Sequence, residues 1–273
     1  MGFSISVYSV HAKKLEDFQD FDAALRLYHE KGIAAVDVIE SELEDTTLKD
    51  YYGRMTASGM GVTCFVATSD FITAKGAALK ENTAKVKGFI DTLSELGVGK
   101  IMLAPMVTSA DTEEEFYAQR EMMVEGYGAM AEYAKGSGVK VTIENQSVAQ
   151  RADSYIRDCK YIIDSVPELG FVLDTGNFYC VKDDVLEAYE VMKDRIVHCH
   201  VKDWEAHDYG RIIRSYLPPL RSSEMGKGVI PLDTLLNRMK ADGYDGTLLL
   251  EINGRPIFKD LLDQSADYLL SFV

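Results

Sequence analysis

The chain has 273 residues, of which 47% are hydrophobic, and it carries a formal net charge of −15. This length suits a single domain with a sizeable core, and the acidic balance disfavours a nucleic-acid partner, because such binding needs a basic face. The first residues lack the basic start and long apolar run of a signal peptide, and no stretch reaches the apolar length of a transmembrane helix. We therefore expect a cytoplasmic protein with no membrane partner.

Short β-rich runs alternate with longer amphipathic stretches along the chain. Strands are predicted at residues 3–10, 35–40, 62–68, 100–106, 140–146, 170–178, 196–204 and 247–253. The segment 78–96 between two of them has apolar side chains at helical spacing, and a glycine typical of a helix C-cap follows most such segments. Continuous apolar strands separated by helices predict a parallel sheet that is covered on its outside.

Eight such strand–helix units fit a closed barrel better than an open, doubly wound sheet. No glycine-rich phosphate fingerprint follows the first strand, which also weighs against a dinucleotide-binding fold. We therefore predict the α/β class, with a single (β/α)8 TIM barrel over residues 1–273 and no domain boundary. The four cysteines show no CxxC pair and are predicted to be reduced and mostly buried: Cys64, Cys159, Cys180 and Cys199.

Four predicted strands in the second half of the chain carry a residue that can bind a metal at or near their carboxyl end. They read Val-Thr-Ile-Glu144, Phe-Val-Leu-Asp174, Val-His-Cys-His200 and Leu-Leu-Leu-Glu251. Each has an ordinary structural alternative: a glutamate paired at the rim, an aspartate that caps the next helix, or a packed core histidine. Because active sites of such barrels lie at the carboxyl ends of the strands, the four together favour one divalent-metal site.

Three carboxylates and one imidazole form a mainly hard ligand set. This set suits Mn²⁺ best, with Mg²⁺, Co²⁺, Zn²⁺ or Fe²⁺ as further candidates. A metal that chelates a carbonyl and its neighbouring hydroxyl acidifies the C–H bond between them. A nearby carboxylate can then remove that proton while the metal stabilises the enediolate. This chemistry suits a substrate that carries a carbonyl group next to a hydroxyl group.

Further substrate contacts are predicted around these strand ends. His198 and Lys202 share a strand face with His200, although a packed inner-face histidine and an ion pair with Glu144 or Glu251 are the respective alternatives. Glu40 ends the second strand and could line the pocket. Arg255 could clamp an anionic group or form a rim salt bridge.

The segment 205–229 is the one long break in the strand–helix pattern. Loops of that length in a compact domain are usually functional. It is locally basic, and phosphate sites in barrels often follow strands seven and eight. Arg211 and Lys227 are therefore predicted contacts of a phosphorylated or carboxylated substrate, with solvated loop charges as the alternative.

The chain resembles the xylose isomerase-like TIM barrels, the sugar phosphate isomerase/epimerase group, over essentially its whole length. The motifs that carry the resemblance are Glu144-Asn, Asp174-Thr-Gly-Asn177, His198-x-His-x-Lys-Asp203, Gly226-Lys-Gly-x-Ile and Gly246-x-Leu-Leu-Leu-Glu251. The group includes ketose 3-epimerases, inosose isomerases and dehydratases, hydroxypyruvate isomerase and the apurinic endonuclease IV proteins.

The resemblance implies that Glu144, Asp174, His200 and Glu251 bind one divalent metal. It also implies that the two glutamates are the catalytic acid and base on opposite faces of the substrate. Many members have a histidine where this chain has Asn177, and in the endonucleases that histidine binds a further zinc. Asn177 can bind a sugar hydroxyl but cannot act as a general base.

The expected function is therefore a metal-dependent sugar or sugar phosphate isomerase or epimerase that works through an enediolate. An inosose-type dehydratase of the same family is one alternative, and a non-catalytic, accessory barrel subunit is another. Endonuclease activity ranks last, because Asn177 and the acidic charge argue against a multi-zinc phosphodiester site. The resemblance further implies a homo-oligomer that pairs through outer helices.

Overall fold

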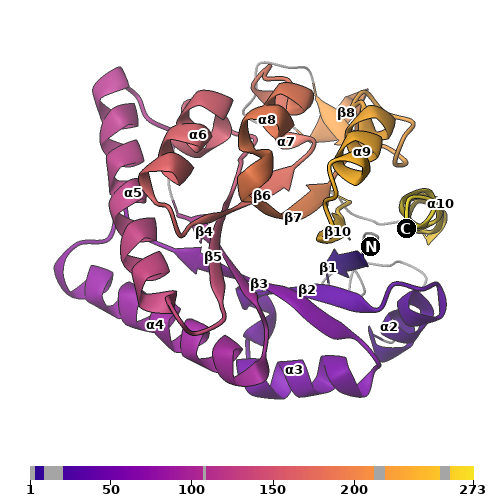
Figure 1. Ribbon diagram of the computed structural model, residues 1–273, viewed down its shortest axis with the longest axis horizontal. Helices are drawn as coiled ribbons and strands as arrows, with labels where there is room; N and C mark the ends of the chain where they lie inside the picture. The colour runs from indigo at the N-terminus through magenta and orange to yellow at the C-terminus, as the bar shows by residue number, and fades with distance from the viewer. Residues whose placement is uncertain (1–3, 9–20, 107–108, 212–218, 253–258) are drawn as a thin grey trace.

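The computed structural model describes residues 4–8, 21–106, 109–211, 219–252 and 259–273. Eight parallel strands close into a barrel in the spatial order β1-β10-β7-β6-β5-β4-β3-β2 (Figure 1). Their bounds are β1 Ser4–Tyr8, β2 Ala35–Ile39, β3 Gly61–Ser69, β4 Lys100–Pro105, β5 Lys140–Glu144, β6 Gly170–Asp174, β7 Ile196–Val201 and β10 Thr247–Leu250. The predicted single (β/α)8 barrel is confirmed.

Helices surround the barrel, as Figure 1 shows. They are α2 Phe21–Glu30, α3 Leu48–Ala57, α4 Gly76–Leu96, α5 Glu113–Ala134, α6 Ile156–Ser165, α7 Asn177–Cys180, α8 Val185–Met192, α9 Leu232–Ala241 and α10 Lys259–Leu270. Short 3₁₀ turns lie at Glu40–Leu43, Ala152–Ser154 and Lys193–Arg195. Within the described residues, no helix has both the length and the apolar character needed to cross a membrane.

Capping residues mark the ends of several outer helices. The Thr112 side chain accepts the amide hydrogen of Glu115 and so caps α5, whose first turn is acidic, as the positive end of a helix dipole favours. Asp184 caps α8 in the same way. Gly97 ends α4 in the left-handed conformation that glycine adopts without strain.

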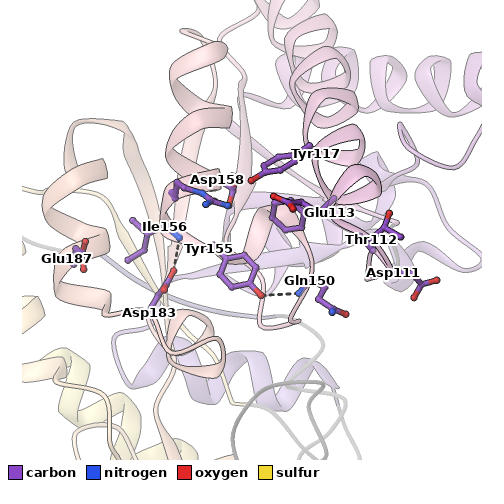
Figure 2. Close-up of a pocket in the computed structure, with 13 residues that line it drawn as sticks. Asp111, Thr112, Glu113, Tyr117, Gln150, Tyr155, Ile156, Asp158, Asp183 and Glu187 are labelled. Carbon is purple, nitrogen blue, oxygen red and sulfur yellow. Dashed lines mark hydrogen bonds and ion pairs between the residues drawn. The ribbon is translucent and has the colours of Figure 1, made fainter.

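The starts of α5, α6 and α8 surround a cavity of about 750 Å³ (Figure 2). Its walls carry three aromatic side chains and several carboxylates. Figure 2 shows two of the hydrogen bonds that shape it: the Gln150 amide donates to the Tyr155 hydroxyl over 3.0 Å, and the Ile156 amide donates to Asp183 over 2.8 Å. These bonds tie together the loops that enter α6 and α8.

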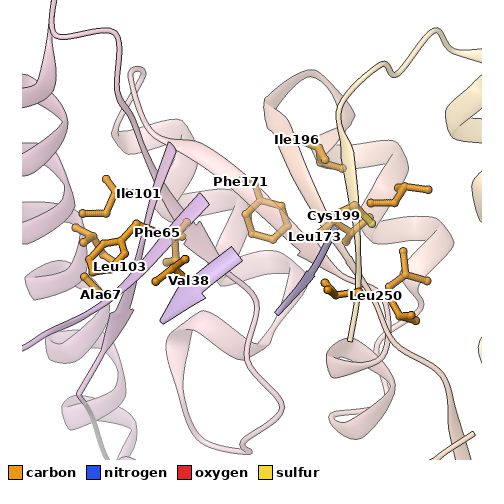
Figure 3. Close-up of a cluster of buried hydrophobic side chains, with 14 of the residues drawn as sticks. Val38, Phe65, Ala67, Ile101, Leu103, Phe171, Leu173, Ile196, Cys199 and Leu250 are labelled. Atoms are coloured by element: carbon orange, nitrogen blue, oxygen red, sulfur yellow. The ribbon is translucent and has the colours of Figure 1, made fainter. Parts of the chain in front are cut away.

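Side chains alternate between the outer and inner faces of the barrel strands, so the hydrophobic core has two parts. Outward-facing side chains pack between the barrel and its helices, among them Phe65, Phe171, Leu173, Cys199 and Leu250 (Figure 3). A separate, smaller apolar cluster fills the barrel interior: Tyr8, Cys64, Val66, Met102, Val172 and Leu249. Because the strand period is two, Asp174, His200 and Glu251 share the inward face with this smaller cluster. All four cysteines are free and buried, as predicted.

Two features differ from the sequence prediction. The fifth, sixth and seventh strands end earlier than predicted, at Glu144, Asp174 and Val201. The sixth ends there because Asp174 accepts the amides of Gly176 and Asn177 and turns the chain into α7. The segment 205–229, predicted as a loop, contains part of an antiparallel hairpin of β8 Trp204–Arg211 and β9 Leu220–Ser222.

Candidate active site

Four side chains gather at the carboxyl ends of neighbouring strands. Glu144 and Asp174 are the last residues of β5 and β6, His200 lies near the end of β7, and Glu251 directly follows β10. One ligand atom from each can be chosen so that all four lie within 4.8 Å of one another. All four residues are buried. The structure thus brings together the whole predicted ligand set, which we call the quartet.

The imidazole of His200 lies between the two glutamates. Its Nδ1 atom is 2.5 Å from Glu144 Oε1 and 3.4 Å from Glu251 Oε2. The second oxygen of Glu144 accepts a hydrogen bond of 2.9 Å from Gln146 Nε2. Burial lowers the pKa of His200, but the neighbouring carboxylates, Glu144 first among them, outweigh burial and raise the pKa well above its usual range.

Asp174 divides its two oxygens between the main chain and a lysine. Oδ1 accepts the amide hydrogens of Gly176 and Asn177, each over 2.8 Å. Oδ2 lies 2.6 Å from the Nζ atom of Lys202. Burial raises the pKa of Asp174 to about 7, although Lys202 acts in the opposite direction, and the charges of Glu251 and Glu144 add to the rise.

Lys202 is itself part of the site. Its Nζ atom also lies 2.8 Å from Glu251 Oε1 and 3.2 Å from Asn177 Oδ1, and the residue is only 4% exposed. Burial raises the pKa of Glu251, but Lys202 and His200 outweigh it and hold that pKa well below the usual range. The ammonium therefore screens two of the three carboxylates from each other.

A second cluster of charged groups lies beneath the quartet, inside the barrel. Asp37, from β2, is wholly buried, and its Oδ2 atom lies 2.7 Å from His198 Nε2 and 3.7 Å from His200 Nε2. The other carboxylate oxygen accepts hydrogen bonds from Thr63 and Ser6. Burial raises the pKa of Asp37, but His198 and then His200 outweigh it, so the carboxyl stays ionised. Asp37 hydrogen-bonds His198 directly, whereas at 3.7 Å it acts on the His200 ring through its charge.

Two asparagines hold the strand ends in place. Asn145 donates to the Asp174 carbonyl over 2.9 Å and accepts the Asp174 amide over 2.8 Å. Asn177 donates to the Asn145 carbonyl over 2.9 Å, while its oxygen faces Lys202. The Asn177 side chain, predicted as a substrate contact, is thus engaged at both ends within the site.

Asp203 organises the chain that follows β7. Its carboxylate accepts the amides of Trp204 and Ile230 at one oxygen and those of Gly226 and Gly228 at the other, over 2.9–3.1 Å. A Cβ atom on Gly228 would lie 2.2 Å from Asp203 Oδ1, so only glycine fits there. The main chain of the Gly-Lys-Gly motif is therefore held against Asp203 by hydrogen bonds.

Of the other predicted substrate contacts, His198 packs edge-on against His200 with ring centroids 5.2 Å apart, and the rest lie apart from the quartet or outside the described side chains. Glu40 accepts hydrogen bonds from Lys85 and from the amide and hydroxyl of Thr68. His198 is wholly buried against Asp37, and Lys227 is exposed. Arg255 and the side chain of Arg211 lie outside the described residues. The cavity in Figure 2 is lined by none of the quartet residues.

The site also contains residues that sequence reasoning missed. Asp37 and Tyr8 reach it from β2 and β1, and the Tyr8 hydroxyl lies 3.3 Å from His200 Nδ1. Asn145, which sequence reasoning named only within a motif, holds the main chain of Asp174, and Gln146 donates to Glu144. A charged residue inside the apolar run Val36-Asp37-Val38 was the one available signal for Asp37, since a buried charge needs a partner.

The quartet fits a divalent metal. With metal–ligand bonds of about 2.1 Å, two ligands of one ion lie no more than about 4.2 Å apart. The observed spread of up to 4.8 Å requires side-chain shifts of only tenths of an ångström. The donor set, with three carboxylates and one imidazole, matches the preference of Mn²⁺ and similar cations.

Comparison with known proteins places the chain in a family. An inosose isomerase from Halalkalibacterium halodurans is 24% identical over 238 residues, which are 86% of this chain and 81% of the relative. A structure of the IolI protein with a binding zinc atom superposes with a TM-score of 0.76 at 18% identity, covering 98% of this chain and 96% of that one. The probable 3-DHS dehydratase AsbF from Bacillus anthracis gives 0.75 at 15% identity, covering 99% of both chains.

The family model that matches spans nearly the whole chain, residues 25–272, and is described as "Xylose isomerase-like TIM barrel". The expected resemblance is thereby confirmed. The chain belongs to the family of xylose isomerase-like TIM barrels.

Proposed function

We propose that this protein is a divalent-metal-dependent isomerase or epimerase that acts on a small polyhydroxy carbonyl compound. The observation that carries the proposal is the buried quartet of Glu144, Asp174, His200 and Glu251 at the rim of the barrel. The similarity to an inosose isomerase over most of both chains supports the same reaction class. An intact quartet counts against a purely accessory role.

Glu144 and Glu251 are the proposed proton-transfer pair. One removes the proton next to the carbonyl group and the other returns a proton to the neighbouring or the same carbon, which gives isomerisation or epimerisation respectively. Gln146 and His200 fix the two oxygens of Glu144, and Lys202 and His200 contact Glu251. Both carboxylates are therefore oriented before the substrate arrives.

A bound divalent ion would be held by the quartet and would supply the positive charge that acidifies the substrate C–H and stabilises the enediolate. Lys202 and Asn177 border the same space and are the proposed contacts for substrate oxygens. Trp204 packs behind them and donates from Nε1 to the Gly176 carbonyl over 3.0 Å. It therefore supports the site wall.

Solvent-proton exchange tests the proposal. Candidate inososes and ketoses are incubated with the protein and Mn²⁺ in deuterated water, and products are analysed by mass spectrometry and NMR. We expect deuterium on the carbon next to the carbonyl, with loss of exchange in Glu144→Gln and Glu251→Gln. Glu132→Gln is the control, because the Glu132 side chain is 74% exposed, lies on α5 and forms an ion pair of 3.7 Å with Lys135. Exchange that persists in both quartet variants would overturn the assignment.

An inosose-type dehydratase is the second candidate. It would share the abstraction of the proton next to the carbonyl and then expel a β-hydroxyl group. The probable dehydratase AsbF, which has the same fold, supports this alternative. The same incubation separates the two reactions, because a dehydratase yields a product lighter by one water, whereas an isomerase or epimerase conserves the mass apart from deuterium.

A further inference from the structure

Lys202 occupies the side of the quartet on which a metal would meet Asp174. The Oδ1 atom of Asp174 already accepts two main-chain amide hydrogens, from Gly176 and Asn177. Its remaining oxygen, Oδ2, is the one that turns into the quartet, and it lies 2.6 Å from Lys202 Nζ. A cation that binds Asp174 through this oxygen must therefore meet the ammonium group.

The same overlap exists at Glu251. Its Oε1 atom lies 2.8 Å from Lys202 Nζ, while Oε2 faces the imidazole of His200 at 3.4 Å. One ammonium thus bridges two of the four ligands at hydrogen-bond distance. A singly charged group at this place offsets the carboxylate charges and also repels an incoming divalent ion.

The backbone of Lys202 is fixed, and its ammonium has other partners nearby. Its amide donates to Thr175 Oγ1 over 2.8 Å, and its carbonyl accepts from the same hydroxyl over 2.7 Å. The ammonium lies 5.7 Å from the centre of the Trp204 ring and 3.2 Å from Asn177 Oδ1. Rotation of the four-carbon side chain would bring the charge closer to Asn177 or to the Trp204 ring, both of which can stabilise it.

We propose that Lys202 is an internal competitor of the metal: its ammonium and the divalent ion compete for Asp174 Oδ2 and for the negative charge of Glu251, so that Lys202 sets the metal affinity of the site. This inference rests on the proposed metal-dependent function. It predicts that the protein folds stably without added metal, since Lys202 offsets the buried carboxylate charges. It also predicts that the metal is held weakly enough to exchange.

Two substitutions of Lys202 with opposite effects test the competition. Lys202→Met removes the charge and keeps the length of the side chain, so Mn²⁺ should bind roughly tenfold to a hundredfold more tightly. Lys202→Arg keeps the charge and offers a fork that bonds two carboxylates at once, so Mn²⁺ should bind more weakly than to the natural protein. Lys85→Met is the matched control, because the Lys85 ammonium also bonds a carboxylate, that of Glu40 at 2.8 Å, away from the quartet.

The measurements are the Mn²⁺ dissociation constant by isothermal titration calorimetry and the unfolding temperature with and without Mn²⁺. We expect Lys202→Met to unfold at a lower temperature without metal and to gain more from Mn²⁺ than the natural protein does. If Lys202→Met fails to fold without metal, the Mn²⁺ dissociation constant of Lys202→Arg still tests the competition.

Equal or weaker Mn²⁺ binding by Lys202→Met, or unchanged binding by Lys202→Arg, would overturn the competition. Absence of Mn²⁺ binding in the natural protein and every variant would instead refute the metal-dependent function itself. The two failures are therefore distinguishable.

Discussion

Replacement of Asp37 by asparagine should weaken metal binding although Asp37 is not a member of the quartet. Asp37 Oδ2 is 2.7 Å from His198 Nε2 and 3.7 Å from His200 Nε2, while the Nδ1 atom of His200 faces the glutamates. A carboxylate at this place favours a hydrogen on Nε2 and leaves the Nδ1 lone pair for the metal. Asparagine keeps the volume but loses the charge, so the imidazole loses its preference for that tautomer.

The expected loss of metal affinity is about tenfold, the lower end of the effect of removing a directly hydrogen-bonded carboxylate, because Asp37 acts on His200 from 3.7 Å. This corresponds to about 1.4 kcal/mol of binding free energy. The change also removes charge-assisted hydrogen bonding from a wholly buried group, which should lower the free energy of unfolding by about 1.5–3 kcal/mol. Both quantities are measurable on the same preparation, by Mn²⁺ titration calorimetry and by urea unfolding.

Asp158→Asn is the matched control. Asp158 is equally buried and is paired with Arg120 and Arg157 at 2.9 and 3.0 Å, but it touches no member of the quartet. It should lose stability and keep its Mn²⁺ affinity. If Asp37→Asn binds Mn²⁺ as tightly as the natural protein while the control behaves as expected, Asp37 does not orient His200 and the reasoning is refuted.

Two further predictions concern protons and packing. Because burial raises the pKa of Asp174 to about 7 and the carboxylates favour protonated His200, a metal must displace protons from both. Mn²⁺ affinity should fall by about tenfold or more from pH 8 to pH 6, and calorimetry in buffers of different ionisation enthalpy should show proton release; an affinity independent of pH would contradict this. Gly228→Ala should lower the free energy of unfolding by about 1–3 kcal/mol, because the added Cβ would collide with Asp203. Gly53→Ala in α3, where a Cβ meets nothing within 4 Å, should instead gain about 0.5–1 kcal/mol in urea unfolding, and an equal loss in both variants would refute the collision.

The barrel and the gathering of the quartet followed from sequence because two simple periodicities determine them. Apolar strands that alternate with helices imply a parallel barrel, and the carboxyl ends of parallel strands meet at one rim. Glu144, Asp174 and Glu251 close or directly follow such strands, so their proximity needs only the topology. This prediction does not depend on how far neighbouring strands are shifted along each other in the barrel.

Contacts across the barrel could not be predicted in the same way. Asp37 on β2 meets His198 and His200 on β7, although β1 and β10 separate these strands in the sheet. Such a contact depends on the stagger of the strands and on side-chain length, which sequence patterns do not specify. Lys202 illustrates the same limit: its predicted ion pair with Glu251 is present at 2.8 Å, but its shorter contact, 2.6 Å to Asp174, was not predicted.

The hairpin of β8 and β9 was missed for a different reason. Its strands pair mainly with each other and carry few apolar residues, so they lack the pattern that marks a buried strand. Asp203 and the Gly226-Lys-Gly motif anchor this segment through main-chain amides. Sequence reasoning identified the motif by resemblance, but the hydrogen bonds explain why glycine is needed.

The metal content of the purified protein tests the central claim most directly. After incubation with Mn²⁺ and removal of unbound ions, elemental analysis of the natural protein should give one metal per chain, and Glu251→Gln should lose most of it, because this change removes one ligand of the quartet. Glu132→Gln, prepared in parallel, should retain the full content. Equal metal content and equal activity in Glu251→Gln and the natural protein would contradict the account.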